Sequence, residues 1–160
     1  MATLLQFSRN IRKLGSRIEN NSVALTKRVA KKALTGLVEG TPVDEGDARS
    51  NWRVSLGNPT RSVIPAYSPG KKLGIGERAN ARATIAAGFA VINRLKVGAK
   101  RGTGQAGTAV FITNAIPYLD RLRSGSSKQQ PNDWVQIAMM EARNEIAGVR
   151  LLSRNVGDGE

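Results

Sequence analysis

Cysteine and histidine are both absent from this sequence of 160 residues. Without cysteine, the chain forms no disulfide bond and offers neither a thiol nucleophile nor a thiolate metal ligand. Without histidine, it lacks the usual imidazole base, the central member of a Ser-His-Asp relay and the commonest ligand of transition metals. Only carboxylates and lysines remain for acid–base chemistry, so the composition argues against most hydrolase designs and predicts that the protein is not an enzyme.

Aromatic residues and long apolar runs are scarce as well. Phe, Trp and Tyr make up 4% of the chain, too few for the interleaved aromatic platforms on which single-stranded nucleic acids stack. No apolar run approaches the roughly 20 residues that span a bilayer, and we expect no membrane partner. A chain of this length is the usual size of one domain, which buries about 70% of its unfolded surface.

Acidic residues are outnumbered by basic ones, 12 to 25, which gives a formal net charge of +13. The excess is uneven: residues 1–40 hold 8 basic and 2 acidic side chains, residues 61–107 hold 9 and 1, and residues 129–160 hold 3 and 5. A field of this sign attracts polyanions such as DNA, or an acidic protein surface, and it keeps the free protein soluble.

The N-terminal quarter of the chain carries a helical pattern. Apolar residues recur every three or four positions from Leu4 to Leu37, and most charged residues lie off this stripe, so the spacing predicts one amphipathic helix over about residues 3–39. The segment Met1–Ile18 has no acidic residue and superficially resembles a transit peptide or an interfacial helix. Its periodicity continues well past any cleavage point, which favours a helix that belongs to the domain.

A turn-forming stretch, Gly40–Trp52, follows this helix. Its first residue is a natural C-terminal stop, and Pro42 prevents the helix from resuming. Asp44 is expected to be the N-cap of a short second helix, whose first turn gains favourable negative charge from Glu45 and Asp47. The stretch is therefore predicted to be a structural corner.

The same three carboxylates, Asp44, Glu45 and Asp47, also offer oxygen ligands to a hard cation. Three carboxylates so close in sequence lack the spaced ligand set of a calcium loop, and helix capping accounts for all of them. We therefore expect no metal site at the corner.

The rest of the chain alternates between periodic segments and loops rich in glycine and proline. Strands are predicted at about 52–56 and 108–113, the second buried on both faces. Helices are predicted after Pro117 up to Gly125, at about 133–152 with an Asp133 cap, and at about 77–95 with an apolar face of Ala81, Ile85, Phe89 and Ile92.

These elements predict an α+β fold in which a long N-terminal helix and a C-terminal helix pack on a small, mainly antiparallel β-sheet. No internal repeat or composition shift indicates a second domain. Residues 1–152 are expected to form one domain with mobile loops at about 57–76 and 96–107, and residues 153–160 to form a C-terminal tail.

The segment Gly102–Gly107 matches the G-x-G-x-x-G dinucleotide fingerprint. That fingerprint follows a strand and opens a helix, so that the pyrophosphate lies at the helix N-terminus. Here the segment follows a predicted helix and precedes a predicted strand. We therefore expect no cofactor, and a flexible basic segment is the better interpretation.

Four cations in this region, Arg94, Lys96, Lys100 and Arg101, are the candidate contact residues. Four positive charges neutralise about as many phosphates, and they would equally dock on an acidic neighbouring protein. No DNA-reading motif accompanies them, so any contact with nucleic acid is expected to be independent of base sequence.

Three stretches of the chain form a recognisable series. The first is Thr41-Pro42-Val43-Asp44-Glu45-Gly46, with Arg49 and the exit Ser50-Asn51-Trp52; the second is Thr113–Tyr118 before a short helix; the third is the terminal helix after a proline-containing loop. In this order they resemble the tail-completion, or tail-to-head joining, proteins of long-tailed bacteriophages, similar in style to minor tail protein Z. The family's Thr-Pro-Val-Asp-Thr-Gly corner differs at Glu45.

The resemblance implies a structural virion protein, assembled in the bacterial cytoplasm, that completes the head-proximal end of the tail and joins it to the neck. It implies a homo-oligomeric ring around the DNA channel, in which a hexamer would match the symmetry of a tail tube. The implied partners are neck or connector proteins and tail-tube or tail-terminator proteins. The four candidate cations would line the channel, with nonspecific contact to genomic DNA, or grip an adjacent ring; the corner residues Pro42, Asp44, Gly46 and Trp52 would be structural.

A basic protein that binds nucleic acid without sequence preference is the alternative. It would explain the charge but not the corner. It predicts salt-sensitive DNA binding by an isolated monomer, whereas the tail interpretation predicts ring assembly, or binding to tails, in the absence of DNA.

Overall fold

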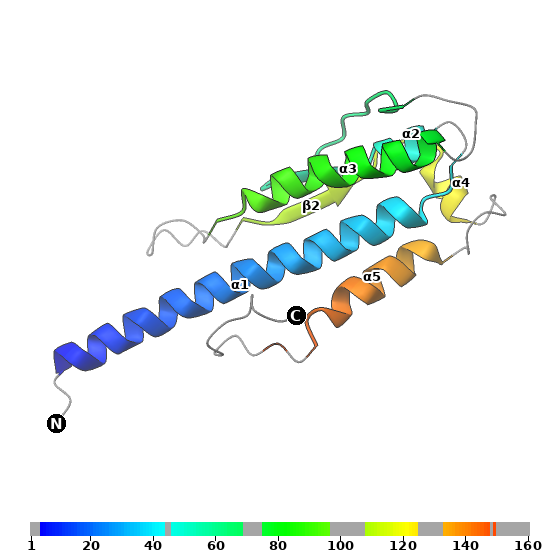
Figure 1. The fold of residues 1–160 in the computed structure, drawn as a ribbon. Helices are drawn as coiled ribbons and strands as arrows, with labels where there is room; N and C mark the ends of the chain where they lie inside the picture. The colour runs from blue at the N-terminus through cyan, green and yellow to red at the C-terminus, as the bar shows by residue number, and fades with distance from the viewer. Residues whose placement is uncertain are drawn as a thin grey trace.

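The computed structural model of the protein describes residues 4–43, 46–68, 75–96, 108–124, 133–147 and 149. In chain order the elements are α1 (Leu4–Gly40), α2 (Asp47–Ser50), β1 (Arg53–Leu56), α3 (Ile75–Asn93), β2 (Val110–Thr113), α4 (Leu119–Arg123) and α5 (Trp134–Asn144). The helix α1 lies between α5 on one side and the layer of α3 and the sheet on the other (Figure 1). The predicted α+β fold, with long helices and a small antiparallel sheet, is confirmed.

The first helix is unbroken and has 37 residues, which corresponds to about 55 Å at the usual rise per residue. Its bounds agree with the predicted range of 3–39. Only its C-terminal half is enclosed, where Leu34 and Val38 have no exposed surface and Ala30 and Leu37 are also buried. The apolar stripe that predicted the helix is thus covered over its second half alone, while the first half extends beyond the other helices (Figure 1).

Small residues allow α5 to pack closely along the second half of α1. A Cβ atom added at Gly36 would lie 2.9 Å from the Cβ atom of Ala138, and one added at Gly40 would lie 3.1 Å from Cε3 of Trp134. Gly40 ends the helix as predicted. It does so without the left-handed conformation of a usual glycine stop, so its main role is to make room for the indole ring.

The C-terminal helix is shorter than predicted, because it ends at Asn144 and not near Leu152. The amides of residues 145–147 donate to carbonyl oxygens three residues earlier, not four, a tighter pattern that is common at helix ends. Asp133 occupies the predicted N-cap position, although its side chain makes no capping hydrogen bond. Apolar spacing continues past the helix, which is why the sequence placed the end too late.

The two strands form an antiparallel two-stranded sheet, in which Arg53 lies opposite Thr113. Val54, Val110 and Ile112 pack against the core between α1 and α3. Every residue of both strands is only half-buried. The prediction that the second strand is buried on both faces is therefore wrong, since the helices that contact this sheet leave its second face partly open.

The most deeply buried line of α3 consists of small or polar residues except at its C-terminal end. Asn80 and Thr84 are each 1% exposed, Gly88 is buried, and Ile92 has no exposed surface. Of the predicted apolar face, only Ile92 lies on this line, and the other three residues are half-buried: Ala81, Ile85 and Phe89. Asn80 forms hydrogen bonds with Ser50 and Ser68, whereas the hydroxyl of Thr84 is buried without a partner in the described residues.

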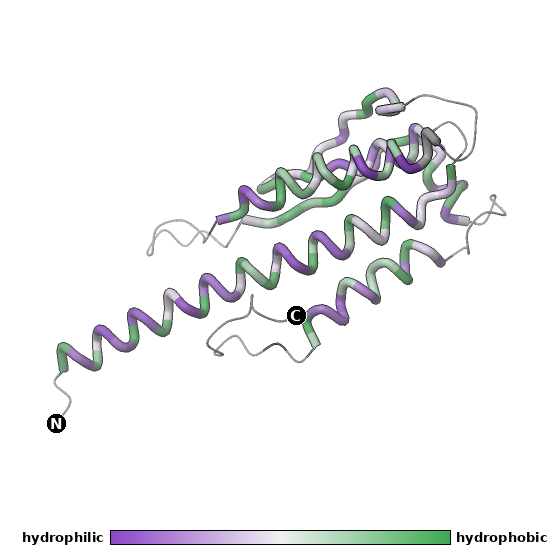
Figure 2. The backbone as a smooth tube through the Cα atoms, in the orientation of Figure 1, coloured by the Kyte–Doolittle hydropathy of each residue, from purple (hydrophilic) through white to green (hydrophobic). Residues whose placement is uncertain are grey.

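Apolar residues follow the facing sides of α1, α3 and α5, and on α1 they continue toward the N-terminus with no helix opposite (Figure 2). Residues 57–68 form neither helix nor strand, as predicted, but α3 begins at Ile75, inside the predicted loop. The short helix after Pro117 is confirmed as α4 and has Ser124 as its C-cap. Other predictions fall outside the described residues: the Gly125 stop, the fingerprint 102–107 and the tail 153–160.

Candidate functional site

The corner between α1 and β1 is a cluster of buried polar side chains. Thr41, Ser50 and Asn51 have no exposed surface, and Arg49 is 6% exposed. Burial of polar groups destabilises a fold unless they form hydrogen bonds. Here their hydrogen bonds connect the corner to α1, to α3 and to the segment after β1.

Arg49 binds the C-terminal end of α1. Its Nη2 atom donates to the carbonyl oxygens of Glu39 at 3.2 Å and Thr41 at 2.7 Å. The last carbonyls of a helix lack partners within the helix, and a cation beside them is favoured by the helix dipole. The sequence showed Arg49 only as part of the corner, without this role.

Trp52 connects the corner to α1 and α5. Its Nε1 atom donates to Oγ1 of Thr41 at 2.7 Å, and that hydroxyl donates to the carbonyl oxygen of Leu37 at 2.6 Å. Its ring meets that of Trp134 on α5 edge to face, with centroids 6.2 Å apart and planes at 86°, a favourable aromatic geometry. Trp52 therefore packs at the point where α1, α5 and the start of β1 meet.

Two asparagine side chains hold the segment after β1 against the corner. Asn51 binds both backbone groups of Ile64: its Nδ2 donates to the carbonyl oxygen and its Oδ1 accepts from the amide, each at 2.7 Å. Asn80 of α3 binds both backbone groups of Ser68, at 3.0 and 2.7 Å, and its Oδ1 also accepts from Ser50 Oγ at 3.1 Å. These bonds fix a segment that has no regular secondary structure.

Gly46, and not Asp44, is the N-cap residue of α2. Its φ of +89° lies in the left-handed region that favours glycine, and a Cβ atom there would overlap Nδ2 of Asn80. The prediction that Asp44 caps this helix is therefore wrong, and Asp44 itself lies outside the described residues. Asp47 lies in the first turn as predicted, and Pro42 is buried beside the end of α1.

Three segments that are far apart in the sequence come into contact at this corner. Nδ2 of Asn114, just after β2, donates to the carbonyl oxygen of Ala48 in α2 at 2.8 Å. On the other side, Trp134 at the start of α5 packs on Trp52. The corner, the exit of the second strand and the terminal helix thus form one structural unit.

The two described candidate cations lie at the opposite end of α3 from the corner. Arg94 and Lys96 are exposed directly after that helix, while Lys100 and Arg101 lie outside the described residues. Leu95 between them is 4% exposed and anchors the chain to the core. The described pair is therefore held in place at the surface.

Two basic residues of α1 bind the C-terminal ends of α3 and α5. Lys27 Nζ donates to the carbonyl oxygen of Asn93, the last residue of α3, at 3.0 Å. Arg28 forms an ion pair with Glu145, the C-cap of α5, with Nε 2.8 Å from Oε2, and its Nη2 donates to the Glu145 carbonyl oxygen at 3.3 Å. Both cations lie at helix C-termini, where the dipole favours them.

The N-terminal arm, residues 4–20 of α1, exposes the apolar stripe that predicted it. Leu4 is 88% exposed, Phe7 62% and Ile11 47%, and their helical spacing places them on one face. Contiguous exposed apolar surface of this kind marks an interaction site. In the described part of the chain, no other helix lies beside the arm (Figure 1).

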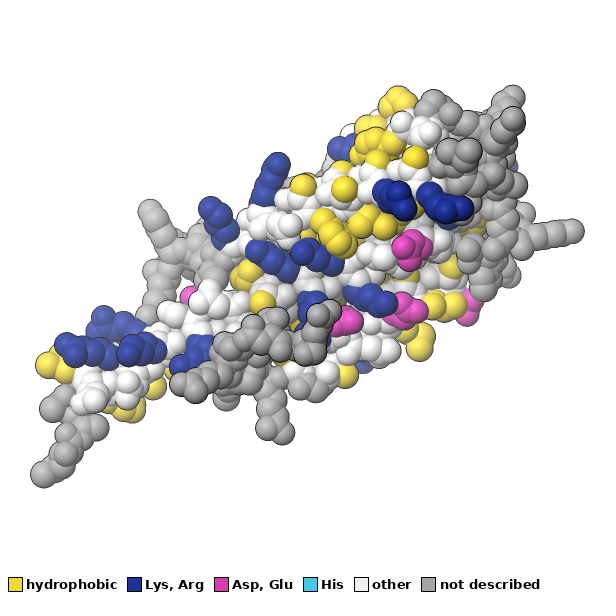
Figure 3. Space-filling model, in the orientation of Figure 1, with side chains coloured by type: hydrophobic (Ala, Val, Ile, Leu, Met, Phe, Trp, Pro, Cys, Tyr) yellow, Lys and Arg dark blue, Asp and Glu magenta, His cyan; other side chains and the backbone are white. Residues whose placement is uncertain are grey.

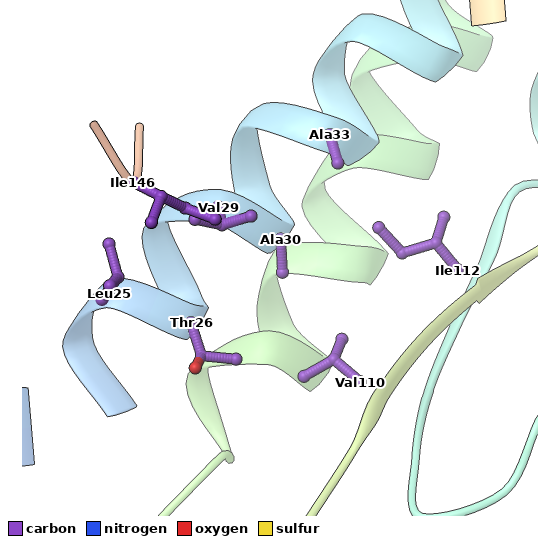
Figure 4. A pocket seen from close by; sticks show the side chains of 8 residues that line it. All are labelled: Leu25, Thr26, Val29, Ala30, Ala33, Val110, Ile112 and Ile146. Carbon is purple, nitrogen blue, oxygen red and sulfur yellow. The ribbon is translucent and has the colours of Figure 1, made fainter. Parts of the chain in front are cut away.

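A second apolar surface is exposed on α5 and just after it, where Met139, Met140 and Ile146 are each at least half-exposed. Together with α1 they form a groove of about 680 Å³, which we call the α1–α5 groove; it is lined by Val29, Ala33, Gln136, Met139, Met140, Ala142, Arg143 and Ile146. A smaller hollow of about 320 Å³ between α1 and β2 shares Val29, Ala33 and Ile146 with it (Figure 4).

Charge is divided between the arm and α5. The arm carries four cations, Arg9, Arg12, Lys13 and Arg17, and one carboxylate, whereas residues 133–147 carry three carboxylates and one arginine. On the face drawn in Figure 3, Lys and Arg side chains line the arm and also lie over the rest of the molecule, where most of the Asp and Glu side chains are found. Two of the α5 carboxylates pair with α1, as Arg28–Glu145 at 2.8 Å and Lys32–Glu141 at 3.1 Å, and both remain partly exposed.

No protein-family model, curated protein or solved structure matches the chain. In the described ranges, no group of three or more Asp, Glu, His or Cys side chains is placed to hold a metal ion. No helix there combines the length and the hydropathy needed to cross a membrane. The features of the described residues that bear on function are therefore the corner, the arm and the α1–α5 groove.

Proposed function

We propose that this chain is a structural subunit that completes the head-proximal end of a bacteriophage tail and joins it to the neck, as a homo-oligomeric ring around the DNA channel. One observation carries the proposal: the helix at the centre of the core continues into an arm whose apolar side chains, from Leu4 to Leu14, are open to solvent. Contiguous apolar surface of this kind marks a site of interaction, since covering it removes apolar area from water. A subunit built in this way is suited to assembly.

The corner gives independent support. The stretches that resemble tail-completion proteins meet at one end of the molecule, where Asn114 binds Ala48 and Trp134 packs on Trp52. The resemblance therefore falls on one structural unit and not on scattered positions. Buried hydrogen bonds make such a corner rigid, and a rigid corner fixes how the segments that meet there are oriented in an assembly.

The charge of the protein also suits a ring around DNA. The net charge is +13, and Arg94 and Lys96 are exposed at the end of α3. Cations that contact phosphates without reading bases would let a genome pass in any sequence.

The proposal is tested by imaging the purified, nuclease-treated protein in negative stain and by locating it on phage particles with an antibody. We expect closed rings in the absence of DNA and label at the junction of head and tail. A strictly monomeric protein that is absent from virions would overturn the proposal.

Nonspecific nucleic-acid binding is the second candidate, because Arg78 and Arg82 lie one turn apart and exposed on α3. It predicts that the monomer binds duplex DNA with an affinity that falls steeply as salt is raised. Changing both arginines to alanine would then weaken DNA binding and reduce its salt dependence. If rings form equally well with and without these arginines and without DNA, the tail function is favoured over this one.

A further inference from the structure

We propose that the N-terminal arm of one copy docks into the α1–α5 groove of the next copy, with its apolar stripe against Met139, Met140 and Ile146. This inference concerns the contact between subunits, and it rests on the proposed function only in taking the assembly to be a ring. It assigns a specific partner, a second copy of this chain, to both exposed apolar surfaces.

The arm cannot reach the groove of its own molecule. The helix α1 is continuous from Leu4 to Gly40, and the groove lies beside its second half, at Val29 and Ala33. A straight helix does not fold back on itself, and no other described element lies beside the arm (Figure 1), so we assign the cover of the arm to a neighbouring copy.

The two surfaces agree in length. The exposed stripe from Leu4 to Leu14 has 11 residues, and so does α5; each corresponds to about 16 Å of helix. Methionine side chains adapt their shape to an incoming apolar surface. An amphipathic helix lying in an apolar groove is a recurrent mode of protein recognition.

Charge favours the groove over a pair of arms. Two arms packed together would bring eight cations and two carboxylates into one contact, since each arm holds four cations and one carboxylate. The groove is instead flanked by two ion pairs, Arg28–Glu145 and Lys32–Glu141, in which a cation of α1 offsets each carboxylate. With Arg143, which also lines the groove, the balance there is three cations to two carboxylates, so the groove repels the arm less than a second arm would.

The contact would be heterologous, because it joins two different surfaces. Each copy would present an arm to one neighbour and a groove to the other. Repetition of such a contact gives a closed ring or an open filament, and the proposed function requires the ring.

The first test compares assembly by matched aspartate variants of the full chain, using light scattering coupled to size-exclusion chromatography. Ile11→Asp on the stripe and Met140→Asp in the groove should each raise the concentration needed for assembly about tenfold or more. Ser16→Asp, on the opposite face of the arm, and Ile137→Asp, an exposed position of α5 outside the groove, should assemble normally. Circular dichroism checks that all four variants fold.

The second test uses the absence of cysteine, which makes the chain a clean background for cross-linking. Copies that carry Phe7→Cys, Ile11→Cys or Leu14→Cys are mixed with copies that carry Met140→Cys and are treated with a short bis-maleimide. We expect arm-to-groove dimers of unlike copies for at least one arm position. Ser16→Cys mixed with Met140→Cys is the control and should give none.

Each alternative occupant has its own outcome. If cross-links form only between two arm cysteines, the partner of the arm is a second arm and not the groove. If the wild-type monomer binds anionic lipid vesicles and Ile11→Asp does not, the partner of the arm is a membrane surface. A Met140→Asp protein that is less stable but assembles normally would assign the groove to residues of the same chain. All three overturn the inference. Rings that form through arm and groove but never appear on virions would leave the contact standing and overturn the tail function instead.

Discussion

The hydroxyl groups of Thr41 and Thr84 are equally buried but differently satisfied. Oγ1 of Thr41 donates to the carbonyl oxygen of Leu37 and accepts from Nε1 of Trp52. Oγ1 of Thr84 has no hydrogen-bond partner in the described residues. An unpaired buried polar group costs about 1–3 kcal/mol, so the same substitution should have opposite effects at the two positions.

Thr84→Val should raise the free energy of unfolding by about 1 kcal/mol, because it removes an unpaired hydroxyl at nearly constant volume. Thr41→Val should lower it by about 2 kcal/mol, because it removes two hydrogen bonds and leaves the indole of Trp52 without its acceptor. Urea unfolding followed by tryptophan fluorescence measures both. If the free energy of unfolding fell by a similar amount in both variants, the hydroxyl of Thr84 would have a hydrogen-bond partner.

Trp52→Ala should lower the free energy of unfolding by about 3–5 kcal/mol and impair assembly, because it removes a buried ring from the junction of α1, α5 and β1. Asp47→Asn should leave stability and assembly nearly unchanged, since an asparagine Oδ1 still accepts from the amide of Ala66 as the carboxylate does at 3.0 Å. Denaturant unfolding and chromatography of the assembled state measure the two effects. If Asp47→Asn alone abolished assembly in a folded protein, the structural interpretation of the corner would be wrong.

At the scale of elements, the helices approach one another through residues without large side chains. Gly36 and Gly40 of α1 accommodate α5, and Gly88 of α3 accommodates Leu34 and Val54. Close packing of this kind tolerates little added volume.

Gly88→Ala should lower the free energy of unfolding by about 1–3 kcal/mol although alanine favours helix. The added Cβ atom would overlap the Leu34 side chain and lie 2.9 Å from Cγ2 of Val54. Ala87→Leu adds more volume at the preceding, exposed position of α3 and should change stability by less than about 0.5 kcal/mol. Thermal and urea unfolding of the two variants measure the contrast, and an unchanged Gly88→Ala protein would contradict the packing described for α3.

The periodicity of the sequence predicted the helices and strands better than it predicted which of their residues are buried against distant segments. It placed α1 and the starts of α4 and α5 correctly, because apolar spacing and proline positions are local features. It could not identify Asn80 as a buried residue, since that depends on hydrogen bonds to Ser50 and Ser68 from distant segments. For the same reason it assigned the α2 cap to Asp44, whereas the position is filled by a glycine that fits beside Asn80.

The candidate site was foreseen only in part. The corner and its tryptophan were singled out, and the cations Arg94 and Lys96 are exposed as surface contacts require. The arm was predicted as a helix but not as a projection, because one sequence does not show where neighbouring helices end. The groove depends on how α1 and α5 pack, and no local pattern in the sequence indicates it.

At the scale of the whole molecule, the arm and the rest of the protein should behave as separate parts. A lone helix of the arm's length is marginal in water, and its apolar side chains from Leu4 to Leu14 are exposed and lie outside the core cluster. The core beside α3 and α5 depends only on the second half of α1.

Amide hydrogen exchange should show this division directly. In the monomer we expect fast exchange for residues 4–20 and slow exchange for residues 30–38, and in the assembled protein slow exchange for both. A variant that lacks residues 1–20 should unfold at the same urea concentration as the full chain and should not assemble. Protection of the arm in a verified monomer would show that the arm already packs within its own chain.

The arm and the buried half of α1 belong to one continuous helix, so the direction in which the apolar stripe of the arm faces is fixed relative to the core. A residue inserted near Asn20 would turn the stripe by about 100° relative to the core, while a seven-residue insertion would restore its direction to within about 20° and lengthen the arm by about 10 Å. If the helix sets the geometry of a ring, the first insertion should abolish assembly, and the second should permit contacts between copies at an altered spacing. The length and the twist of the unbroken helix would then set the distance and the angle between successive copies.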